Sequence, residues 1–266
     1  ALSTFLFEHG GDIMESTQFS SDDSSRMFYI RIEFFVEDLL EKREQLERDF
    51  SILAEKFDID YQFTYHDKRK RAAIFVSKEI HCLLELLWEW QSGDLEMDIP
   101  LVISNHEDAR DVVEPLGIPY YYIPANKDIR EEVESKQLKL LEQYEIDFII
   151  LARYMQILTP NFVERFPNQI INIHHSFLPA FIGARPYERA YERGVKLIGA
   201  TSHYVTNDLD EGPIIEQDIE RVDHRNNVAS LKKIGQRVER AVLARAVKWH
   251  LQDRIIVKDN KTIVFH

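Results

Sequence analysis

The sequence predicts an α/β protein, a doubly wound and mostly parallel sheet preceded by a small α+β module. From residue 72 onward, short apolar runs alternate with amphipathic stretches, the order typical of strands joined by helices. Several of these runs, such as 148–152, are apolar throughout, which is typical of parallel strands covered on both faces. Before residue 68 the order differs, because two strand-like runs follow each other directly.

The N-terminal module is predicted to contain a helix, a hairpin, a second helix and a strand. Leu2, Phe5 and Leu6 recur at the spacing of one helical face, and Gly10 with Gly11 favours a stop after them. The remaining elements are expected at 14–23, 26–35, 36–57 and 60–66. This order lacks one initial strand of a six-element βαββαβ sandwich, and the chain begins without methionine. We therefore expect the native chain to extend upstream, with a shorter variant as the alternative.

The charged segment 66–72 is predicted to join two domains, one spanning 1–67 and one spanning 72–266. Its basic run also fits a nucleic-acid patch, although a solvated linker is the more ordinary interpretation. The second domain is expected to have strands and helices in alternation, ending with one long helix and a short strand. The strands are predicted at 72–77, 99–105, 118–124, 147–154, 170–176, 197–206, 213–222 and 262–265, and the helices at 81–91, 106–117, 130–145 and 227–251.

Composition restricts the class of protein. The net charge is −13, with 46 acidic and 33 basic residues, so a phosphate backbone is disfavoured as the main partner. The one cysteine, Cys82, excludes an internal disulfide and suits a reducing cytoplasmic environment. No apolar run approaches the ~20 residues of a membrane span.

Two adjacent histidines follow a predicted buried strand. Side chains alternate along a strand, so Asn172, His174 and Ser176 are expected on one face. His175 is expected on the opposite face, with Ile171 and Ile173. A strand end in an open α/β sheet is where ligands bind, while an internally bonded core histidine is the alternative.

Two further segments are candidate parts of a site. The first, 199–215, contains His203 and then Asn207, Asp208, Asp210 and Glu211, although a polar turn would have the same composition. The second, 151–160, ends a buried strand, and its Met155, Ile157 and Leu158 either line an apolar slot or pack in the core.

Three other kinds of site are disfavoured. A metal ion on His174, His203 and Asp210 is conceivable, but the chain has no HExxH and no cysteine pair. Ser176 lacks the G-x-S-x-G context of an exposed nucleophile. No glycine lies between Ala72 and Trp90, so the first turn of the second domain offers no phosphate cradle.

The motifs Asn172-x-His174-x-Ser176-x-Leu178-Pro179, "LARYMQIL" and "HYVTNDLDEGP" together resemble the formyltetrahydrofolate-dependent formyltransferase fold, a Rossmann-type fold. The whole chain is most similar to the deformylase branch of that family, which joins an N-terminal, ferredoxin-like ACT domain to the catalytic domain. The resemblance implies hydrolysis of 10-formyltetrahydrofolate to tetrahydrofolate and formate, which supplies purine biosynthesis. It implies no cofactor beyond this substrate and water, a small amino acid such as glycine or methionine at the ACT domain, and a homo-oligomer.

The resemblance also assigns residues. Asn172, His174 and Asp210 carry over as the catalytic trio, supported by His203. One wall of the folate slot carries over to Tyr154, Met155, Gln156, Ile157 and Leu158, and the other to the segment from Val205 to Asp210, which includes Asn207 and Asp208. The loop 181–190 is expected to be a lid.

The resemblance and the residue types give a mechanistic hypothesis. Asn172 and a protonated His174 would donate hydrogen bonds to the oxyanion, and Asp210 would align and deprotonate water. The glycine-free turn and the acidic charge favour water over a phosphorylated or tRNA acceptor. A formyltransferase acting on another amine, or a binding protein without turnover, remains open at this stage.

Overall fold

The computed structural model describes residues 1–21, 27 to 126, 128–179 and 185–266. The chain separates into two compact units, residues 1–68 with 265–266 and residues 69–264. Each unit has its own hydrophobic core.

The N-terminal unit places two helices on one face of a hairpin. The order is α1 (Leu2–Glu8), β1 (Gly11–Ser20), β2 (Phe28–Val36) and α2 (Leu39–Phe57), and β1 pairs antiparallel with β2. Gly10, at φ +70°, ends α1 in the left-handed region that favours glycine. Phe5 and Leu6 of α1 pack against Leu46, Phe50 and Ala54 of α2 to form the core.

The prediction of a strand over 60–66 is wrong. Among the described residues this segment pairs with no strand, because the sheet of this unit consists of β1 and β2. Its aromatic side chains still pack on α2: the Phe63 ring lies 5.1 Å from that of Phe50, and Arg43 lies 3.5 Å from the Tyr65 ring centroid. The alternation in the sequence thus reflects packing, and without a neighbouring strand the ladder cannot form.

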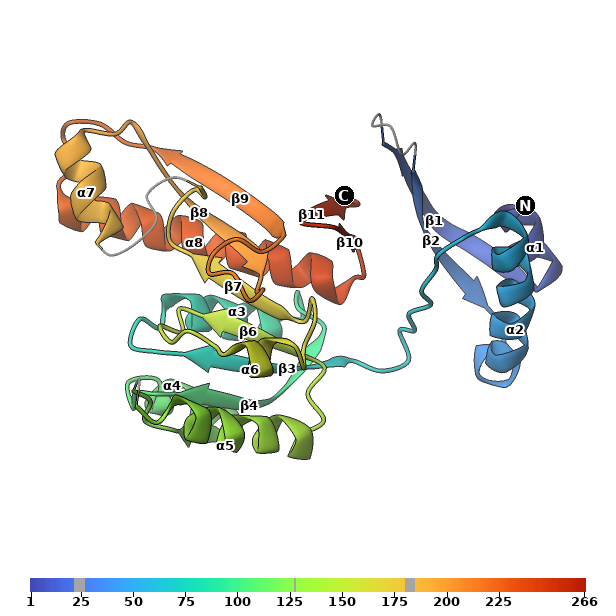
Figure 1. The fold of residues 1–266 in the computed structure, drawn as a ribbon, viewed down its shortest axis with the longest axis horizontal. Helices are drawn as coiled ribbons and strands as arrows, with labels where there is room; N and C mark the ends of the chain where they lie inside the picture. The colour runs from blue at the N-terminus through green and yellow to red at the C-terminus, as the bar shows by residue number, and fades with distance from the viewer. Residues whose placement is uncertain (22–26, 127, 180–184) are drawn as a thin grey trace. The chain divides into compact units, whose positions relative to one another are not determined.

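In the larger unit, the described residues form a sheet of seven strands in the order β5-β4-β3-β6-β7-β8-β9 (Figure 1). The first five of these are mutually parallel, whereas β8 and β9 are antiparallel to their neighbours, as expected for a mixed extension. The strands are β3 (Lys70–Val76), β4 (Met97–Ser104), β5 (Tyr120–Tyr122), β6 (Phe148–Ala152), β7 (Ile170–His174), β8 (Leu197–Tyr204) and β9 (Ile214–Arg221).

Helices cover both faces of this sheet, as the apolar strands require. One face packs on α3 (His81–Ser92) and α8 (Val228–Leu251), and the other on α5 (Arg130–Gln143) and α6 (Pro160–Val163). The helix predicted over 106–117 is two short pieces, α4 (Arg110–Val113) and η1 (Glu114–Leu116), and α7 is Pro186–Arg193. The final strand belongs to a hairpin of β10 (Ile255–Lys258) and β11 (Lys261–Val264).

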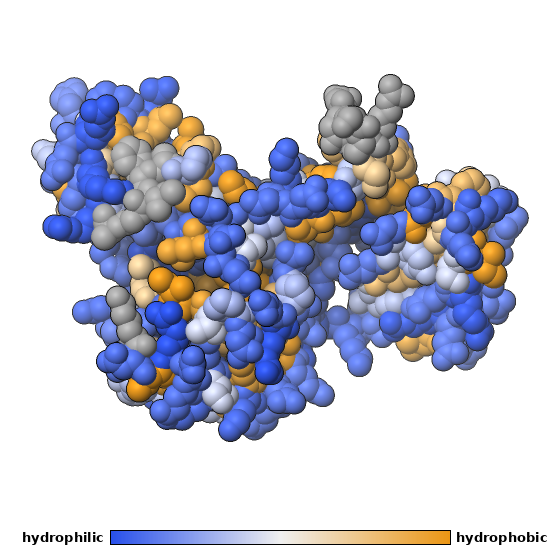
Figure 2. Space-filling model, in the orientation of Figure 1, coloured by the Kyte–Doolittle hydropathy of each residue, from blue (hydrophilic) through white to orange (hydrophobic). Residues whose placement is uncertain are grey.

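The outer surface is mostly polar, with scattered apolar areas (Figure 2). In the part of the chain that the structure describes, no helix is both long and apolar enough to cross a membrane.

The strand order creates a switch point beside β3. The chain passes from β3 outward to β4 and β5, then returns to place β6 on the other side of β3. Open α/β sheets bind ligands at the carboxyl ends of strands next to such a point. Here these ends are Ser77, Arg153 and His175, the residues that follow β3, β6 and β7.

Candidate active site

Asn172 and His174 lie on one face of β7, at its carboxyl end. Ile171 and Ile173 point the opposite way, into the core beneath α3 and α8. Because side chains alternate between the two faces along β7, Asn172 and His174 face the side of the sheet covered by α5 and α6. His174 is 6% exposed, so its imidazole lies largely out of bulk water.

Asp210 reaches this pair through a tight turn after β8. The backbone N–H of Tyr204 donates to the carbonyl of Pro213 at 2.9 Å, which folds the turn back on itself. Asp210 has φ +58°, and a Cβ on Gly212 would lie 1.8 Å from the Tyr204 carbonyl oxygen. This close approach explains why residue 212 is a glycine. The turn brings Asp210 Oδ1 to 3.2 Å from His174 Nδ1.

His203 completes the group from the neighbouring strand. It stands opposite Asn172 in the β7–β8 ladder. Its Nδ1 lies 2.9 Å from the carbonyl oxygen of Tyr204, an acceptor, so Nδ1 carries a proton. Its Nε2 then faces the Asn172 amide nitrogen at 3.2 Å and Asp210 Oδ1 at 3.8 Å.

The carboxyl group of Asp210 is strongly acidic in this setting. The contact with His174 first, and then the contact with His203, outweigh partial burial and hold the pKa of Asp210 well below its usual range. Asp210 is therefore an anion at any working pH. In contrast, His174 Nε2 is buried and has no hydrogen-bond partner among the described residues. This nitrogen is therefore free to interact with a ligand or a water molecule at the end of β7.

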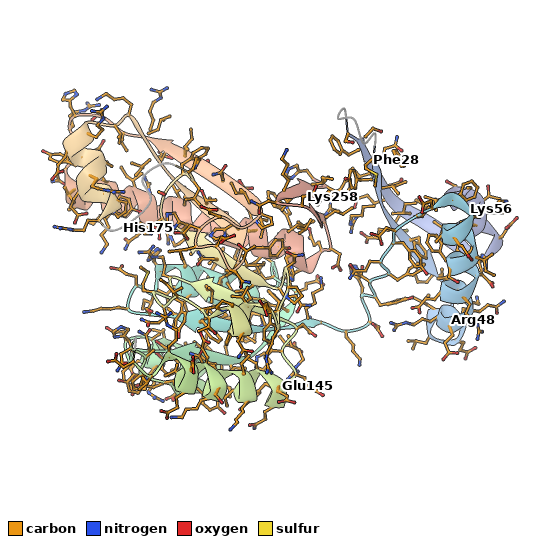
Figure 3. All side chains as sticks on the ribbon, in the orientation of Figure 1. Phe28, Arg48, Lys56, Glu145, His175 and Lys258 are labelled. Carbon is orange, nitrogen blue, oxygen red and sulfur yellow. The ribbon has the colours of Figure 1, made fainter. Side chains whose placement is uncertain are left out.

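His175, labelled in Figure 3, lies on the side of the sheet expected for it, with its ring 6.4 Å from that of Tyr187. It does not pack in the core with Ile171 and Ile173, because strand pairing ends at His174 and the His175 side chain is only partly buried. Its ring stacks beside His174, with centroids 4.9 Å apart. Burial first, and then the charges of Arg153 and His174, lower the pKa of His175 to about 4.

Ser176 also lies beyond the strand, in a turn held by β8. The Thr201 hydroxyl donates to the Ser176 carbonyl at 2.9 Å and accepts from the Leu178 N–H at 3.0 Å. Gln217 donates to the Leu178 carbonyl at 3.0 Å. These contacts fix the direction in which the chain leaves His174.

The predicted wall at 154–158 is divided between core and surface. Met155 and Ile157 are 58% and 51% exposed, and Gln156 and Leu158 are partly exposed, so their side chains are accessible to a ligand. Tyr154 is 6% exposed, packs on Phe75 and accepts a hydrogen bond from Gln137 at 2.9 Å. The structure therefore leaves only the backbone of Tyr154 available to a ligand.

Ser77 holds this wall in place, a role that sequence reasoning missed. Its hydroxyl accepts from the Met155 N–H at 2.9 Å and donates to Asn105 Oδ1 at 2.7 Å. Its own N–H donates to the Arg153 carbonyl at 3.2 Å. The signal that could have found it is its position, since it directly follows the first parallel strand at the switch point.

The second predicted wall follows β8. Val205 is partly buried against the core under α5 and α6, and its N–H donates to the Ile170 carbonyl at 2.9 Å. Asn207 and Asp208 are exposed, and Asn207 donates to Glu164 at 3.2 Å. Of the predicted lid 181–190, residues 181–184 lie outside the described residues.

A second polar group that sequence reasoning missed surrounds Glu239, which is 1% exposed. His81 Nε2 lies 2.8 Å from Glu239 Oε2, and the Tyr187 hydroxyl donates to Oε1 at 2.5 Å. Arg153 Nε lies 3.4 Å from Oε2. A signal was present, because Glu239 interrupts the apolar stripe of α8 between Val238 and Val242.

Comparisons with known proteins agree with this geometry. Residues 70–247 match the family described as Formyl transferase. A formyltetrahydrofolate deformylase of Bacillus subtilis (strain 168) is 66% identical over 266 residues, covering 100% of this chain and 89% of that protein. The crystal structure of a formyltetrahydrofolate deformylase from Pseudomonas syringae is similar with a TM-score of 0.94 and 45% identity, covering 100% of this chain and 89% of that one.

A more distant structure matches about three quarters of the chain. The glycinamide ribonucleotide transformylase 1 of Symbiobacterium toebii is similar with a TM-score of 0.69 and 27% identity, covering 77% of this chain and 99% of that one. The match of the whole chain to the first two proteins is much stronger. The chain belongs to the formyl transferase family and, within it, to the formyltetrahydrofolate deformylases.

Proposed function

We propose that this protein hydrolyses 10-formyltetrahydrofolate to tetrahydrofolate and formate, with Asn172, His174 and Asp210 as its catalytic residues and His203 in support. The observation that carries the assignment is the pair of buried His174 and partly buried Asp210, whose Nδ1 and Oδ1 atoms lie 3.2 Å apart, with His203 joining Asp210 to Asn172. The formate would supply purine biosynthesis, and no cofactor beyond the folate substrate and water is needed for this reaction.

The folate would lie between two walls on the α5/α6 side of the sheet. Exposed Met155 and Ile157, with Gln156 and Leu158, would form one wall, and Val205, Asn207 and Asp208 the other. Apolar side chains held at half exposure suit a flat aromatic ring, because covering them removes apolar surface from water. The formyl group on N10 would then reach the trio at the end of β7.

The low pKa of Asp210 supports a specific division of roles. A carboxylate that is so weakly basic is suited to holding the His174 Nδ1–H, which leaves the Nε2 lone pair to take a proton from water. Water oxygen adds to the formyl carbon, and the Asn172 amide donates to the resulting oxyanion. The C–N10 bond then breaks as His174 returns the proton to N10, and formic acid loses its proton to solvent.

His203 would hold Asn172 for this task. With its Nδ1 proton donated to the Tyr204 carbonyl, neutral His203 accepts one N–H of Asn172 through Nε2. The second N–H of the amide remains for the oxyanion. A donor fixed before the reaction needs no reorganisation as charge develops.

The decisive experiment measures formate release from 10-formyltetrahydrofolate in the absence of any amine. Multiple turnovers of formate are expected. A rate that depends on added amine would instead indicate a formyltransferase, and folate binding without formate would indicate a binding protein.

The N-terminal unit is proposed to be an ACT-like domain that binds a small amino acid, glycine or methionine, within a homo-oligomer. Support comes from its helix–hairpin–helix order and from a pocket of about 350 Å³ lined by Asp38, Leu39, Leu40, Glu41, Arg43, Tyr65, His66 and Asp67. A change in the formate rate on adding either amino acid tests the effector, and light scattering tests the assembly.

A cytoplasmic location is proposed on separate grounds. The buried thiol of Cys82 is free, which suits a reducing compartment. Fractionation of cells, with detection by an antibody to this chain, tests the location.

A further inference from the structure

The buried Glu239 cluster lies next to the catalytic trio, yet the mechanism above does not use it. Burial raises the pKa of Glu239, but the His81 hydrogen bond and the Arg153 charge outweigh this, so the pKa lies below its usual value. Glu239 is therefore a buried anion held by its neighbours. Such a group is costly to maintain unless it is fully paired, and here it is.

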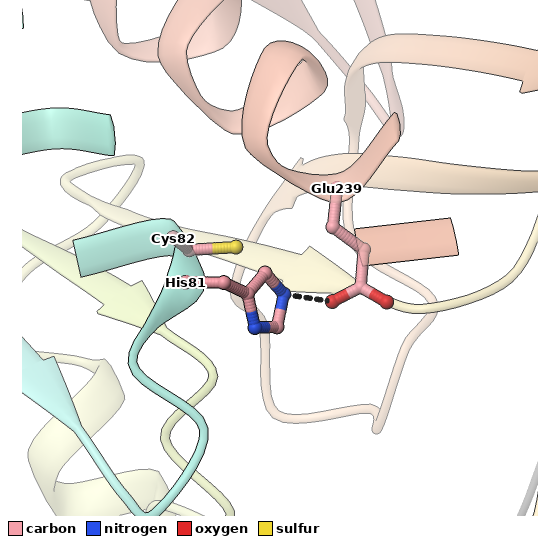
Figure 4. A group of neighbouring side chains, drawn as sticks. All are labelled: His81, Cys82 and Glu239. Carbon is pink, nitrogen blue, oxygen red and sulfur yellow. Dashed lines mark hydrogen bonds and ion pairs between the residues drawn. The ribbon is translucent and has the colours of Figure 1, made fainter. Parts of the chain in front are cut away.

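A metal site is the first function to consider for this cluster. One donor atom of each of His81, Cys82 and Glu239 lies within 4.8 Å of the others (Figure 4). However, Arg153 lies 3.4 Å from the same Glu239 oxygen that faces His81. A metal cation there would sit against a guanidinium, and Arg153 already balances the charge of Glu239. With Arg153 beside the Glu239 carboxylate, these side chains are better described as an ion-pair cluster than as a metal site.

The cluster continues up to the catalytic histidine. Arg153 follows β6, and its charge contributes to the low pKa of His175, which follows β7. The His175 ring stacks on His174 at 4.9 Å and lies 6.4 Å from the Tyr187 ring. Because the Tyr187 hydroxyl also bonds Glu239, Tyr187 links His175 to the Glu239–Arg153 pair, and Glu239, Arg153 and His175 form a layer against the side of His174.

This layer and the proposed folate slot lie on opposite faces of the sheet. Tyr154, Leu158 and Val205 belong to the α5/α6 side, whereas His81 and Glu239 come from α3 and α8. His174 stands at the strand end, where the two sides meet. A second reactant larger than water, arriving opposite the folate, would have to pass the layer.

A surface pocket lies directly behind the layer. It has a volume of about 470 Å³, and His81 is one of its walls, together with Lys233, Ile234, Gln236, Arg237 and Arg240. The pocket has room for a small reactant. His81, a wall of this pocket, bonds Glu239, which in turn pairs with Arg153.

We propose that Arg153, held by Glu239, fills the acceptor side of the active centre and thereby restricts the nucleophile to water. This specificity role deepens the proposed hydrolysis and rests on it. The fit of the layer is tight: a Cβ on Gly235 would lie 2.1 Å from the Tyr187 hydroxyl oxygen. Arg153 itself holds φ +63°, a backbone conformation that would be relaxed in glycine.

Both competing reactions break the same bond. In hydrolysis, water oxygen bonds to the formyl carbon, the C–N10 bond breaks, and N10 receives a proton. With an amine, nitrogen bonds to the same carbon, N10 again receives a proton, and an N-formyl amide forms. The ratio of the two products therefore reports which nucleophile reaches the carbon.

The test uses Arg153→Gly in the full chain, with 10-formyltetrahydrofolate labelled with ¹³C in the formyl group and glycinamide as a small primary amine. Carbon NMR measures N-formylglycinamide and formate together. We expect formate almost exclusively from the original protein, and a product ratio shifted toward the amide by at least about tenfold in the variant. The ratio does not depend on how much of the variant is folded.

Arg153→Met is the matched control, because methionine fills much of the same space at the same backbone angle without the charge. It should keep the ratio of the original protein. An unchanged ratio in Arg153→Gly, or an equal rise in Arg153→Met, would overturn the proposal. Should Arg153→Gly fail to fold, His81→Ala opens the layer from the pocket side, and an unchanged ratio there would overturn it as well. Formate release without amine by the original protein, measured in parallel, tests the hydrolysis separately.

Discussion

His174 Nδ1 lies 3.2 Å from Asp210 Oδ1, while Nε2 of the same ring is buried without a hydrogen-bond partner in the described parts of the chain. One nitrogen is thus occupied by an anion, and the other is left for the reaction. This arrangement orients an imidazole as a general base. It joins residues 36 positions apart in the sequence, which only the turn after β8 brings together.

Replacing Asp210 with Asn should reduce kcat by about 10²-fold or more, because the anion that orients His174 is lost. The melting temperature should also fall, because the low pKa of Asp210 means that its ionised form stabilises the folded state. Steady-state formate release and a thermal melt measure both quantities. A variant with nearly normal kcat would remove Asp210 from the catalytic group.

The acidic limb of the pH–rate profile should not report Asp210. Its pKa lies well below its usual value, so it stays ionised as the pH falls toward 4, and its protonation should not produce the loss of activity in that range. We expect His174→Ala to lose about 10²-fold or more in kcat. A profile of kcat/KM between pH 4 and 9 checks the limb, and an apparent pKa near 4 in that limb would contradict the assignment.

Replacing Asn172 with Ala should lower kcat by about 10²–10³-fold, the usual cost of one oxyanion donor. Asn207→Ala is the matched control, because this exposed amide bonds Glu164 on the proposed folate wall. The control should affect KM more than kcat. Equal losses of kcat in the two variants would argue against a special role for Asn172.

Replacing Tyr154 with Phe should destabilise the larger unit by about 1–3 kcal/mol, because it leaves the buried Gln137 amide without its acceptor. KM for the folate should stay unchanged, since the hydroxyl points into the core. Tyr122→Phe, at an exposed position, is the control for stability. Ile157→Ser should instead raise KM, and Leu84→Ser, equally apolar but on α3, should leave it unchanged. A raised KM in Tyr154→Phe would restore that side chain to the folate slot.

The stability of the larger unit should fall with pH below about 6.5. Burial first, and then Lys70, lower the pKa of His250 to about 3, so the folded protein does not bind the proton that the unfolded chain takes up. This contribution is complete above pH 6.5 and is lost as the pH falls toward 3, by about 1.4 kcal/mol per pH unit. Urea unfolding at pH 5 and 7 measures it. His250→Gln should show a shallower dependence, while the exposed His224→Gln should keep the original slope.

Much of the larger unit could be predicted because its signals are local. Apolar runs such as 148–152 require burial on both faces, and the long stripe of α8 requires a sheet to cover. The strand predicted at 60–66 failed because alternation shows which side chains pack, whereas a strand also needs a partner for its backbone. His175 lies on the predicted side but is less buried than expected, because the ladder ends at His174 and the chain leaves the sheet there.

The sequence by itself determined the doubly wound domain and the candidate residues Asn172, His174, His203 and Asp210, since strand periodicity and residue chemistry are encoded along the chain. The tertiary structure alone decided that Tyr154 faces the core, that Ser77 holds the wall at Met155, and that Arg153 pairs with Glu239. These are contacts between distant segments at the carboxyl edge of the sheet. Their formation depends on strand order and helix packing, which no local pattern specifies.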